Sequence, residues 1–79
     1  MISELKKRIE SGKVFLGMRE SLRNMNNLDK AIVAADCRKE SIKILESKNI
    51  KIESFDMRKD EMASKLELEF ECEVFGVRK

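Results

Sequence analysis

The spacing of hydrophobic residues changes repeatedly along the chain, and each change marks the boundary of a predicted element. Three apolar residues recur at helical spacing near the start: Ile2, Leu5 and Ile9. Gly12 follows them, at a position where glycine commonly ends a helix. The short apolar run Val14–Leu16 then stops at Gly17, which predicts a strand. The chain is therefore predicted to begin with a helix and a strand.

The same alternation continues towards the middle of the sequence. Three apolar residues at intervals of four and three predict a second helix with these side chains buried: Met18, Leu22 and Met25. An asparagine-rich stretch at 24–27 ends that helix, and the unbroken apolar run 31–35 predicts a strand buried on both faces. Asp36 is the predicted N-cap of a third helix. The apolar residues of this third helix are Ile42, Ile44 and Leu45.

The remaining third of the chain repeats this order once more. Asn49 ends the third helix, and a third strand is indicated by Ile50, Ile52 and Phe55. Residues 60–66 predict a short fourth helix with acidic side chains in its first turn, where the helix dipole favours them. Residues 68–74 alternate strictly between apolar and acidic side chains, which predicts a last strand with one face in water.

Helices and strands that alternate in this way predict an α/β fold. We expect a three-layer αβα sandwich whose four-stranded sheet is mainly parallel or mixed, with helices on both faces. The length of 79 residues predicts a single small domain over residues 1–79. No stretch approaches the roughly 18–20 apolar residues of a membrane span, and no signal peptide is recognisable, so we expect a cytoplasmic protein without a membrane partner.

The charged residues are many, and they are unevenly distributed. The chain has 17 basic and 15 acidic side chains, a net charge of only +2. Residues 1–30 carry seven basic and four acidic side chains, whereas residues 66–79 carry two and four. A basic face for polyanions and an ordinary solvated surface explain this distribution about equally well.

Nothing in the sequence favours catalysis. Histidine, the commonest general base, is absent, and no serine is surrounded by a glycine elbow. The three glycines are too dispersed for a phosphate-binding loop. Cys37 and Cys72 lack the neighbouring ligands that zinc needs, and we expect both to be small buried hydrophobes. We therefore expect no enzyme, no metal, no cofactor and no small-molecule substrate.

The most informative segment is LGMRESLR, at residues 16–23. Gly17 would let the backbone of a partner approach closely, and Arg19 and Arg23 lie one helical turn apart, where they can hold a phosphate. Glu20 can accept hydrogen bonds from a base edge with two donors, as in guanine. The alternative is an ordinary amphipathic helix with a Glu–Arg pair worth a few tenths of a kcal/mol. From the residues alone, the ordinary helix is the preferred interpretation.

A resemblance to a known family favours RNA binding instead. Residues 2–23 resemble the start of the archaeal and eukaryotic large-subunit ribosomal protein thirty, of the L-seven-Ae superfamily of kink-turn RNA-binding proteins. The matching features are an amphipathic first helix, SGK at 11–13, LG at 16–17, and a serine followed two positions later by a basic residue. The resemblance continues through AIVAADC at 31–37 and resumes over 50–77, where Glu61-Met62-Ala63 replaces the usual Glu-Leu-Gly. It covers nearly the whole chain, although no single motif is highly specific.

The resemblance implies a structural, ribosome-associated RNA-binding protein of the large subunit, which acts in translation as part of a ribonucleoprotein. Its expected target is a kink-turn in ribosomal RNA, where tandem sheared G·A pairs expose guanine edges. By position, Gly17 and Met18 would approach the RNA backbone, and Arg19 would contact a guanine or a phosphate. Glu20 would accept hydrogen bonds from guanine, and Arg23 would be the basic residue one turn later.

A second contact is implied in the loop before the last strand, where apolar side chains meet unstacked bases. Phe70 falls at an aromatic position of this loop, and Leu66 and Leu68 flank it. Phe70 also alternates with Leu68 and Cys72, so a place in the core is an equally good interpretation. Four glutamates surround the loop and should repel phosphate: Glu67, Glu69, Glu71 and Glu73.

These departures keep other interpretations open. The third helix is about one turn shorter than in family members. The acidic end would suit contacts with neighbouring ribosomal proteins. One alternative is a kink-turn-binding subunit of a guide-RNA or ribonuclease P particle, although SGKVFLG favours the ribosomal branch. Another is a degenerate family member that acts as a protein–protein interaction module.

Overall fold

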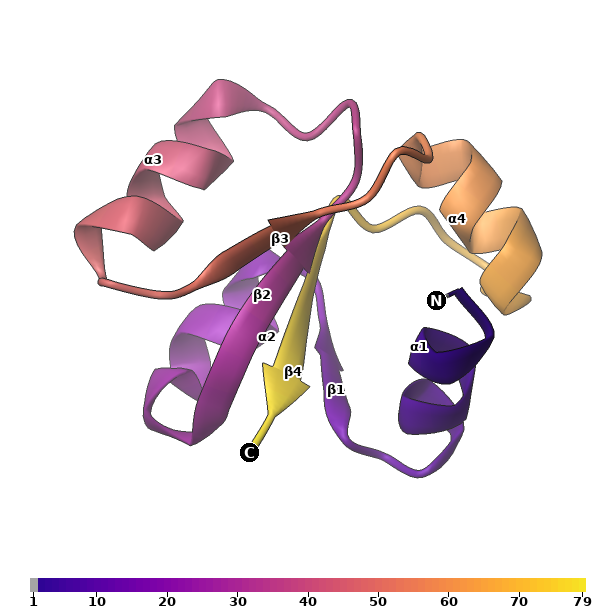
Figure 1. The fold of residues 1–79 in the computed structure, drawn as a ribbon, viewed down its shortest axis with the longest axis horizontal. Coiled ribbons are helices and arrows are strands. Elements are labelled where there is room, and N and C mark those ends of the chain that lie inside the picture. The colour runs from indigo at the N-terminus through magenta and orange to yellow at the C-terminus, as the bar shows by residue number, and fades with distance from the viewer. Residues whose placement is uncertain (1) are drawn as a thin grey trace.

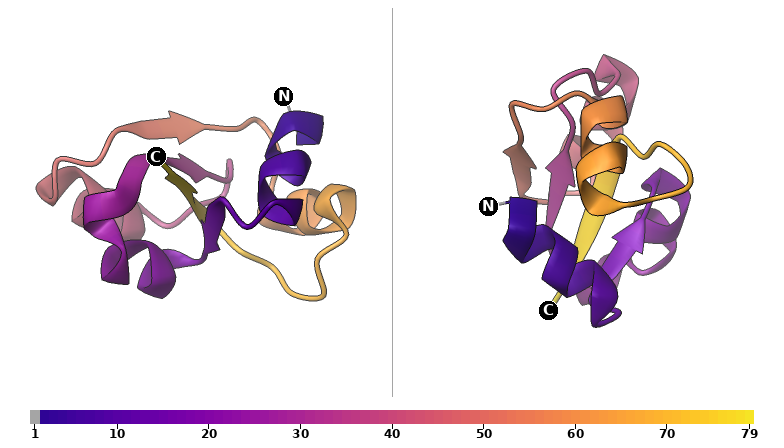
Figure 2. Two further views of the ribbon diagram at one scale, coloured as in Figure 1. Left: turned by 90° about the horizontal axis from the view of Figure 1, so that it is seen from below. Right: turned by 90° about the vertical axis from the view of Figure 1, so that its right-hand side faces the viewer.

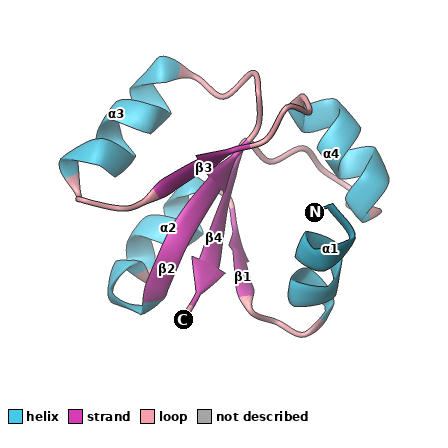
Figure 3. Ribbon diagram, viewed as in Figure 1, coloured by secondary structure: helices cyan, strands magenta, loops and turns pink. Residues whose placement is uncertain are grey.

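Helices and strands alternate along the chain in the order that the sequence predicts. The computed structural model describes residues 2–79 and contains, over that range, four helices, four strands and one 3-10 turn (Figure 1; Figure 3). The helices are α1 (Ile2–Glu10), α2 (Met18–Arg23), α3 (Lys39–Ser47) and α4 (Lys59–Leu66), and the 3-10 turn is η1 (Met25–Asn27). The strands are β1 (Val14–Leu16), β2 (Leu28–Val33), β3 (Ile52–Ser54) and β4 (Val74–Arg78).

The four strands form one mixed sheet with the order β1-β4-β2-β3. The last strand, β4, lies between β1 and β2 and runs antiparallel to both. The one parallel pair of neighbouring strands is β2 and β3, with Ala31 opposite Ile52. Of the two sheet types expected, the mixed one therefore forms, because β4 enters the middle of the sheet against the direction of its neighbours.

Helices cover both faces of the sheet, which confirms the αβα sandwich. Figure 2 shows α1 and α4 on one face and α2 and α3 on the other. The α1–α4 face holds one core cluster, which includes Leu5, Met62, Leu66, Phe75 and Val77. The other face holds a smaller cluster made of Ala31, Val33, Leu45 and Val74. Successive residues of β4 thus point to opposite cores, as the pleat of a strand requires.

The predicted last strand at 68–74 is wrong, because most of this segment is a loop. Residues 67–73 connect α4 to β4, which begins only at Val74 (Figure 3). The alternation of side chains has a different cause: Cys72 is buried and Leu68 is partly buried against the α1–α4 core. The burial of Leu68 and Cys72 in a loop therefore produces the same alternation of apolar and polar residues as a strand with one buried face.

The predicted buried face of the second helix is only partly correct, since Met18 packs against the α2–α3 core but is not fully buried. The buried residue of α2 is Ser21, whereas Leu22 is partly exposed. Met25 lies beyond α2, in η1, and is 36% exposed. The reason is the close approach of α2 to β4 at Gly76, where a Cβ would lie 2.6 Å from the Ser21 Oγ. Only a small side chain fits between this helix and this strand.

Candidate nucleic-acid interface

Segments that are distant in the sequence meet at the end of the sheet where β1, β2 and β3 finish and β4 begins. This is the upper end of the sheet in Figure 1. The backbone N–H of Gly17, before α2, donates to the carbonyl of Val74 at 2.9 Å. The N–H of Ala34, after β2, donates to the carbonyl of Glu73, also at 2.9 Å. The start of α2 and the end of the 67–73 loop therefore lie side by side.

Gly17 occupies a conformation and a place that suit glycine. Its φ is +93°, which residues with side chains rarely adopt, and no atom beyond Gly17 and its chain neighbours lies within 4 Å of the position that a Cβ would take. Its carbonyl accepts hydrogen bonds from Ser21, from the N–H at 3.1 Å and from the Oγ at 2.8 Å. The turn into α2 is therefore fixed from within while its outer side stays open.

The polar side chains of α2 point into solvent, as the sequence predicts. Arg19, Glu20 and Arg23 are exposed, and Arg23 Nη1 lies 3.6 Å from Glu20 Oε1. Arg19 forms no ion pair with any residue of 2–79 that the structure describes. Met18 differs from them, because it is partly buried against the α2–α3 core. The available groups are thus two guanidinium groups and one carboxylate.

The 67–73 loop presents one aromatic side chain to solvent. Phe70 is 54% exposed, so it does not belong to the core. Leu68 is partly buried beneath the loop. Leu66 is only 4% exposed and lies in the α1–α4 core, so its predicted role as a surface contact is wrong. Its position in the last turn of α4, facing α1, explains the difference.

Two of the four glutamates around this loop are neutralised by basic partners. Glu73 Oε1 lies 2.8 Å from Arg38 Nη2, and the Glu73 carboxylate also accepts hydrogen bonds from the Arg38 N–H and the Ser41 hydroxyl. Partial burial raises the pKa of Glu73, but these hydrogen bonds outweigh it and hold the pKa below its usual value. Glu67 pairs with Lys6 at 3.0 Å. The acidic charge left on the loop is that of Glu69 and Glu71.

Two basic doublets at the same end of the sheet were not predicted. Arg38 and Lys39 begin α3, and Arg58 and Lys59 begin α4. The helix dipole disfavours basic side chains at these positions, so their repetition is the signal that sequence analysis missed. The prediction that Asp36 is the N-cap of α3 is wrong, because Arg38 occupies that position. Instead the Asp36 Oδ1 accepts the Lys59 N–H at 2.8 Å, which caps α4.

The other groups at this end offer little chemistry of their own. Burial, with the nearby Glu73 carboxylate, raises the pKa of the Cys37 thiol to about 11, so the thiol stays protonated and weakly nucleophilic at neutral pH. Cys72 is buried, as predicted, whereas Cys37 is only partly so. Within residues 2–79, no group of histidine, cysteine and acidic side chains is placed to hold a metal. No helix in this range is long and apolar enough to cross a membrane.

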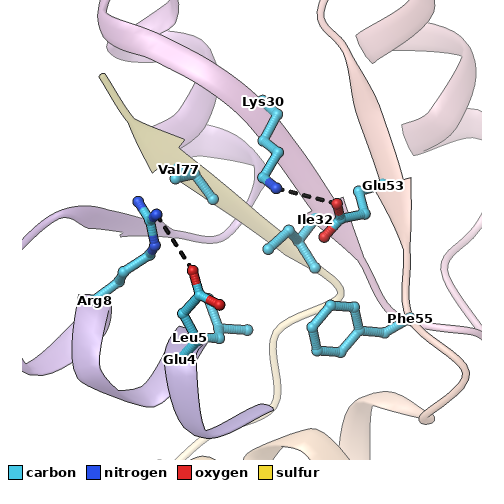
Figure 4. A pocket seen from close by; sticks show the side chains of 8 residues that line it. All are labelled: Glu4, Leu5, Arg8, Lys30, Ile32, Glu53, Phe55 and Val77. Carbon is cyan, nitrogen blue, oxygen red and sulfur yellow. Dashed lines mark hydrogen bonds and ion pairs between the residues drawn. The ribbon is translucent and has the colours of Figure 1, made fainter. Parts of the chain in front are cut away.

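A small cavity of about 130 Å³ lies elsewhere, between α1 and β3. Its apolar lining consists of Leu5, Ile32, Phe55 and Val77 (Figure 4). The charged residues around it pair with each other: Arg8 with Glu4 at 3.5 Å, and Lys30 with Glu53 at 3.1 Å. These charges already satisfy one another, so the cavity is a weaker candidate than the end of the sheet.

The chain matches no protein-family model and no curated protein sequence. The surface described above and the sequence resemblance are therefore the basis on which a function can be inferred.

Proposed function

We propose that this protein binds RNA at the end of the sheet where α2 begins and the 67–73 loop ends. The observation that supports the proposal best is that the 67–73 loop, which carries the exposed ring of Phe70, ends beside the turn into α2, whose polar side chains are exposed. A hydrogen bond between Gly17 and Val74 joins the two segments. An exposed aromatic ring on which an unpaired base can stack, together with polar groups that bind base edges and phosphates, is a common composition of RNA-binding surfaces.

Each group has a definite role in this proposal. Arg19 binds a guanine edge or a phosphate, and Arg23 binds the neighbouring phosphate. Glu20 accepts hydrogen bonds from the two donors of a guanine edge, which requires its contact with Arg23 to loosen. Phe70 stacks on an unpaired base. The open side of Gly17 lets the RNA backbone approach the turn. Lys39 and Lys59 add positive charge at the same end of the sheet, whereas Arg38 and Arg58 already pair with Glu73 and Asp36.

The target in this proposal is a kink-turn of ribosomal RNA, and the protein is a structural component of the large subunit. The sequence resemblance supports this choice, because sheared G·A pairs in a kink-turn expose the guanine edges that Glu20 and Arg19 suit. The pairing of Glu73 with Arg38 supports it as well, since this removes one of the charges that would repel phosphate. Catalysis is no part of the proposal.

A second candidate function is a protein–protein interaction module. The observation that favours it is the sequence Glu69-Phe70-Glu71, in which two acidic side chains without an ion pair in residues 2–79 flank the exposed ring. Such a segment suits a basic protein surface better than a phosphate backbone. Direct binding to RNA distinguishes the two candidates.

The test is a titration of the protein with a short kink-turn RNA at two salt concentrations. The control is the same RNA with its G·A pairs replaced by Watson–Crick pairs. Specific binding to the kinked RNA supports the proposal. Equal and strongly salt-dependent binding to both RNAs would indicate a general basic face, and no binding to either would favour the protein-binding module.

Substitutions in α2 test the assignment of roles. We expect Arg19→Ala and Glu20→Ala each to weaken kink-turn binding by about 1–3 kcal/mol, as the loss of a specific polar base contact does. The midpoint of urea unfolding should barely change, because both side chains are exposed. Lys43→Ala and Glu46→Ala on the exposed side of α3 serve as controls. Equal losses in all four variants would contradict the assignment.

A further inference from the structure

A second recess lies at the opposite end of the sheet, where β2 begins and β4 ends. It has a volume of about 360 Å³, is open to solvent, and is bordered by η1, by the turn between α3 and β3, and by Lys79. The N–H of Lys79 donates to the carbonyl of Asn27 at 2.8 Å, which fixes the end of β4 beside η1. Asn49 has a φ of +59°, and this left-handed residue turns the chain from α3 into β3. The backbone of the recess is thus held by local contacts.

The rim of this basic recess is rich in hydrogen-bond donors. Three lysines line it, Lys48 and Lys51 from the turn between α3 and β3 and Lys79 from the end of β4, and none forms an ion pair within the part of the chain that the structure describes. The amides of Asn26 and Asn49 lie on the same rim, and Asp29 is its one acidic side chain. Three cations against one carboxylate favour an anionic ligand.

Apolar side chains also line the basic recess. Met25, Leu28 and Ile50 contribute to its wall. Met25 has the spacing of a buried helix residue and is nevertheless 36% exposed, so a polarisable apolar surface is available beside the lysines. Cations beside an apolar wall match a nucleotide, whose phosphate is charged and whose base has an apolar face. The volume lies near the lower end of the range of about 300–1,000 Å³ for small-ligand sites, which suits a single nucleotide.

We infer that the basic recess is a second RNA-binding site, which holds one nucleotide of a single-stranded segment. The lysines bind the phosphates on either side of that nucleotide, and its base lies against Met25 and Ile50. The inference goes beyond the proposed function and relies on it only for the choice of RNA as the polymer. With sites at both ends of the sheet, the protein would connect two segments of RNA.

The test uses the isotope-labelled full chain and a six-residue oligouridylate, which cannot form a kink-turn. Backbone amide resonances, followed by NMR during the titration, locate the contact. We expect saturable shifts at residues 25–29, 48–51 and 79. In the variant Lys48→Gln/Lys51→Gln/Lys79→Gln, the slope of log affinity against log salt should become shallower by about 1.4, since each of the two phosphate contacts on a single strand contributes about 0.7.

A matched triple variant separates a defined site from general charge. Lys7→Gln/Lys43→Gln/Lys65→Gln removes the same charge from exposed positions away from the recess and should leave binding within about twofold. Equal weakening in both variants, shifts located elsewhere, or no saturable shift would overturn the inference. Uridine monophosphate that binds as tightly as the oligonucleotide would also overturn it, in favour of a free nucleotide.

A kink-turn RNA added to the same labelled protein reports separately on the proposed function. Kink-turn shifts at α2 and the 67–73 loop, together with no saturable oligouridylate shifts at the basic recess, would support the proposed function and overturn this inference. Oligouridylate shifts at the basic recess without any kink-turn shifts at α2 would support this inference and contradict the proposed function.

Discussion

At the scale of single residues, the contact between Ser21 and Gly76 determines how α2 lies on the sheet. Ser21 is fully buried, and its hydroxyl is satisfied by the carbonyl of Gly17. A Cβ on Gly76 would lie 2.6 Å from Ser21 Oγ and 2.8 Å from a methyl group of Leu28. The same contact that positions α2 therefore also positions Gly17, because the serine bonds to the turn that begins the helix.

Gly76→Ala tests this contact. We expect a loss of about 1–3 kcal/mol in the free energy of unfolding, the usual cost of overpacking. Urea unfolding measures it, and the double variant Ser21→Ala/Gly76→Ala is the control. If the serine oxygen is the obstacle, the second substitution should recover part of the loss. A double variant whose loss equals the sum of the two single losses would show that the obstacle is elsewhere.

At the scale of elements, acidic side chains outside α3 and α4 satisfy the starts of these helices. Asp36 accepts the Lys59 N–H of α4, and Glu73 accepts the Arg38 N–H of α3. Neither helix has a cap from its own N-cap side chain. Each acid follows or precedes a strand of the sheet, so these bonds tie two helices to the end of the sheet that carries the candidate interface.

Removing one of these caps should destabilise the fold measurably. Asp36→Ala should cost about 0.5–2 kcal/mol, the range for the loss of a helix cap. Thermal unfolding of the variant measures the change. Asp56→Ala is the matched control, since Asp56 is exposed and forms no side-chain hydrogen bond within residues 2–79. A similar loss in both variants would argue against a capping role for Asp36.

The other acid should make stability depend on pH. The pKa of Glu73 is lowered in the folded protein, so its contribution is fully present above the ordinary value of about 4.3 and is lost as the pH falls through the lowered value. The difference in unfolding free energy between the wild type and Glu73→Gln should therefore be larger at pH 7 than at pH 3. Urea unfolding at both pH values provides the comparison, and an unchanged difference would contradict the prediction.

Most elements could be predicted from sequence because their signals are local. Gly12 and Gly17 mark real boundaries, and the helical spacing of Ile2, Leu5 and Ile9 predicts α1. The alternation at 68–74 misled, since a loop with two buried anchors has the same pattern as a strand. The buried face of α2 was also beyond prediction, because it depends on a glycine in β4 that is distant in sequence.

The candidate interface was also predictable only where its residues lie close together in the sequence. Arg19, Glu20 and Arg23 lie on one helix, so their common exposure follows from helical spacing. The positions of Leu66 and Phe70 depend on where α4 ends and β4 begins, which local pattern did not resolve. Asp36 and the two basic doublets come together only through the sheet, and no spacing along the chain indicates that.

At the scale of the whole molecule, the two cores differ in size. The α2–α3 core has Leu45 as its largest buried side chain, whereas the other core contains Phe75, Met62 and Leu66. We expect Leu45→Ala to cost about 2–5 kcal/mol. A domain of this length has a total stability of roughly 4–12 kcal/mol, so this single loss is a large part of it.

Leu22→Ala is the comparison for this prediction. The helical pattern placed Leu22 on a buried face, but the side chain is partly exposed, so we expect a loss below about 2 kcal/mol. Urea unfolding of both variants gives the ranking. A larger loss for Leu22→Ala than for Leu45→Ala would contradict the arrangement of α2 on the sheet.

The central position of β4 has a consequence for how the chain folds during its synthesis. Strand β1 pairs only with β4, with Val14 opposite Val77, so it has no partner until almost the last residue described has left the ribosome. Pairings between residues so distant in sequence form slowly, and a strand edge that stays unpaired in the meantime is prone to aggregation. Strand β1 of a nascent chain should therefore remain unpaired until β4 emerges and joins it to the β2–β3 pair in a late step.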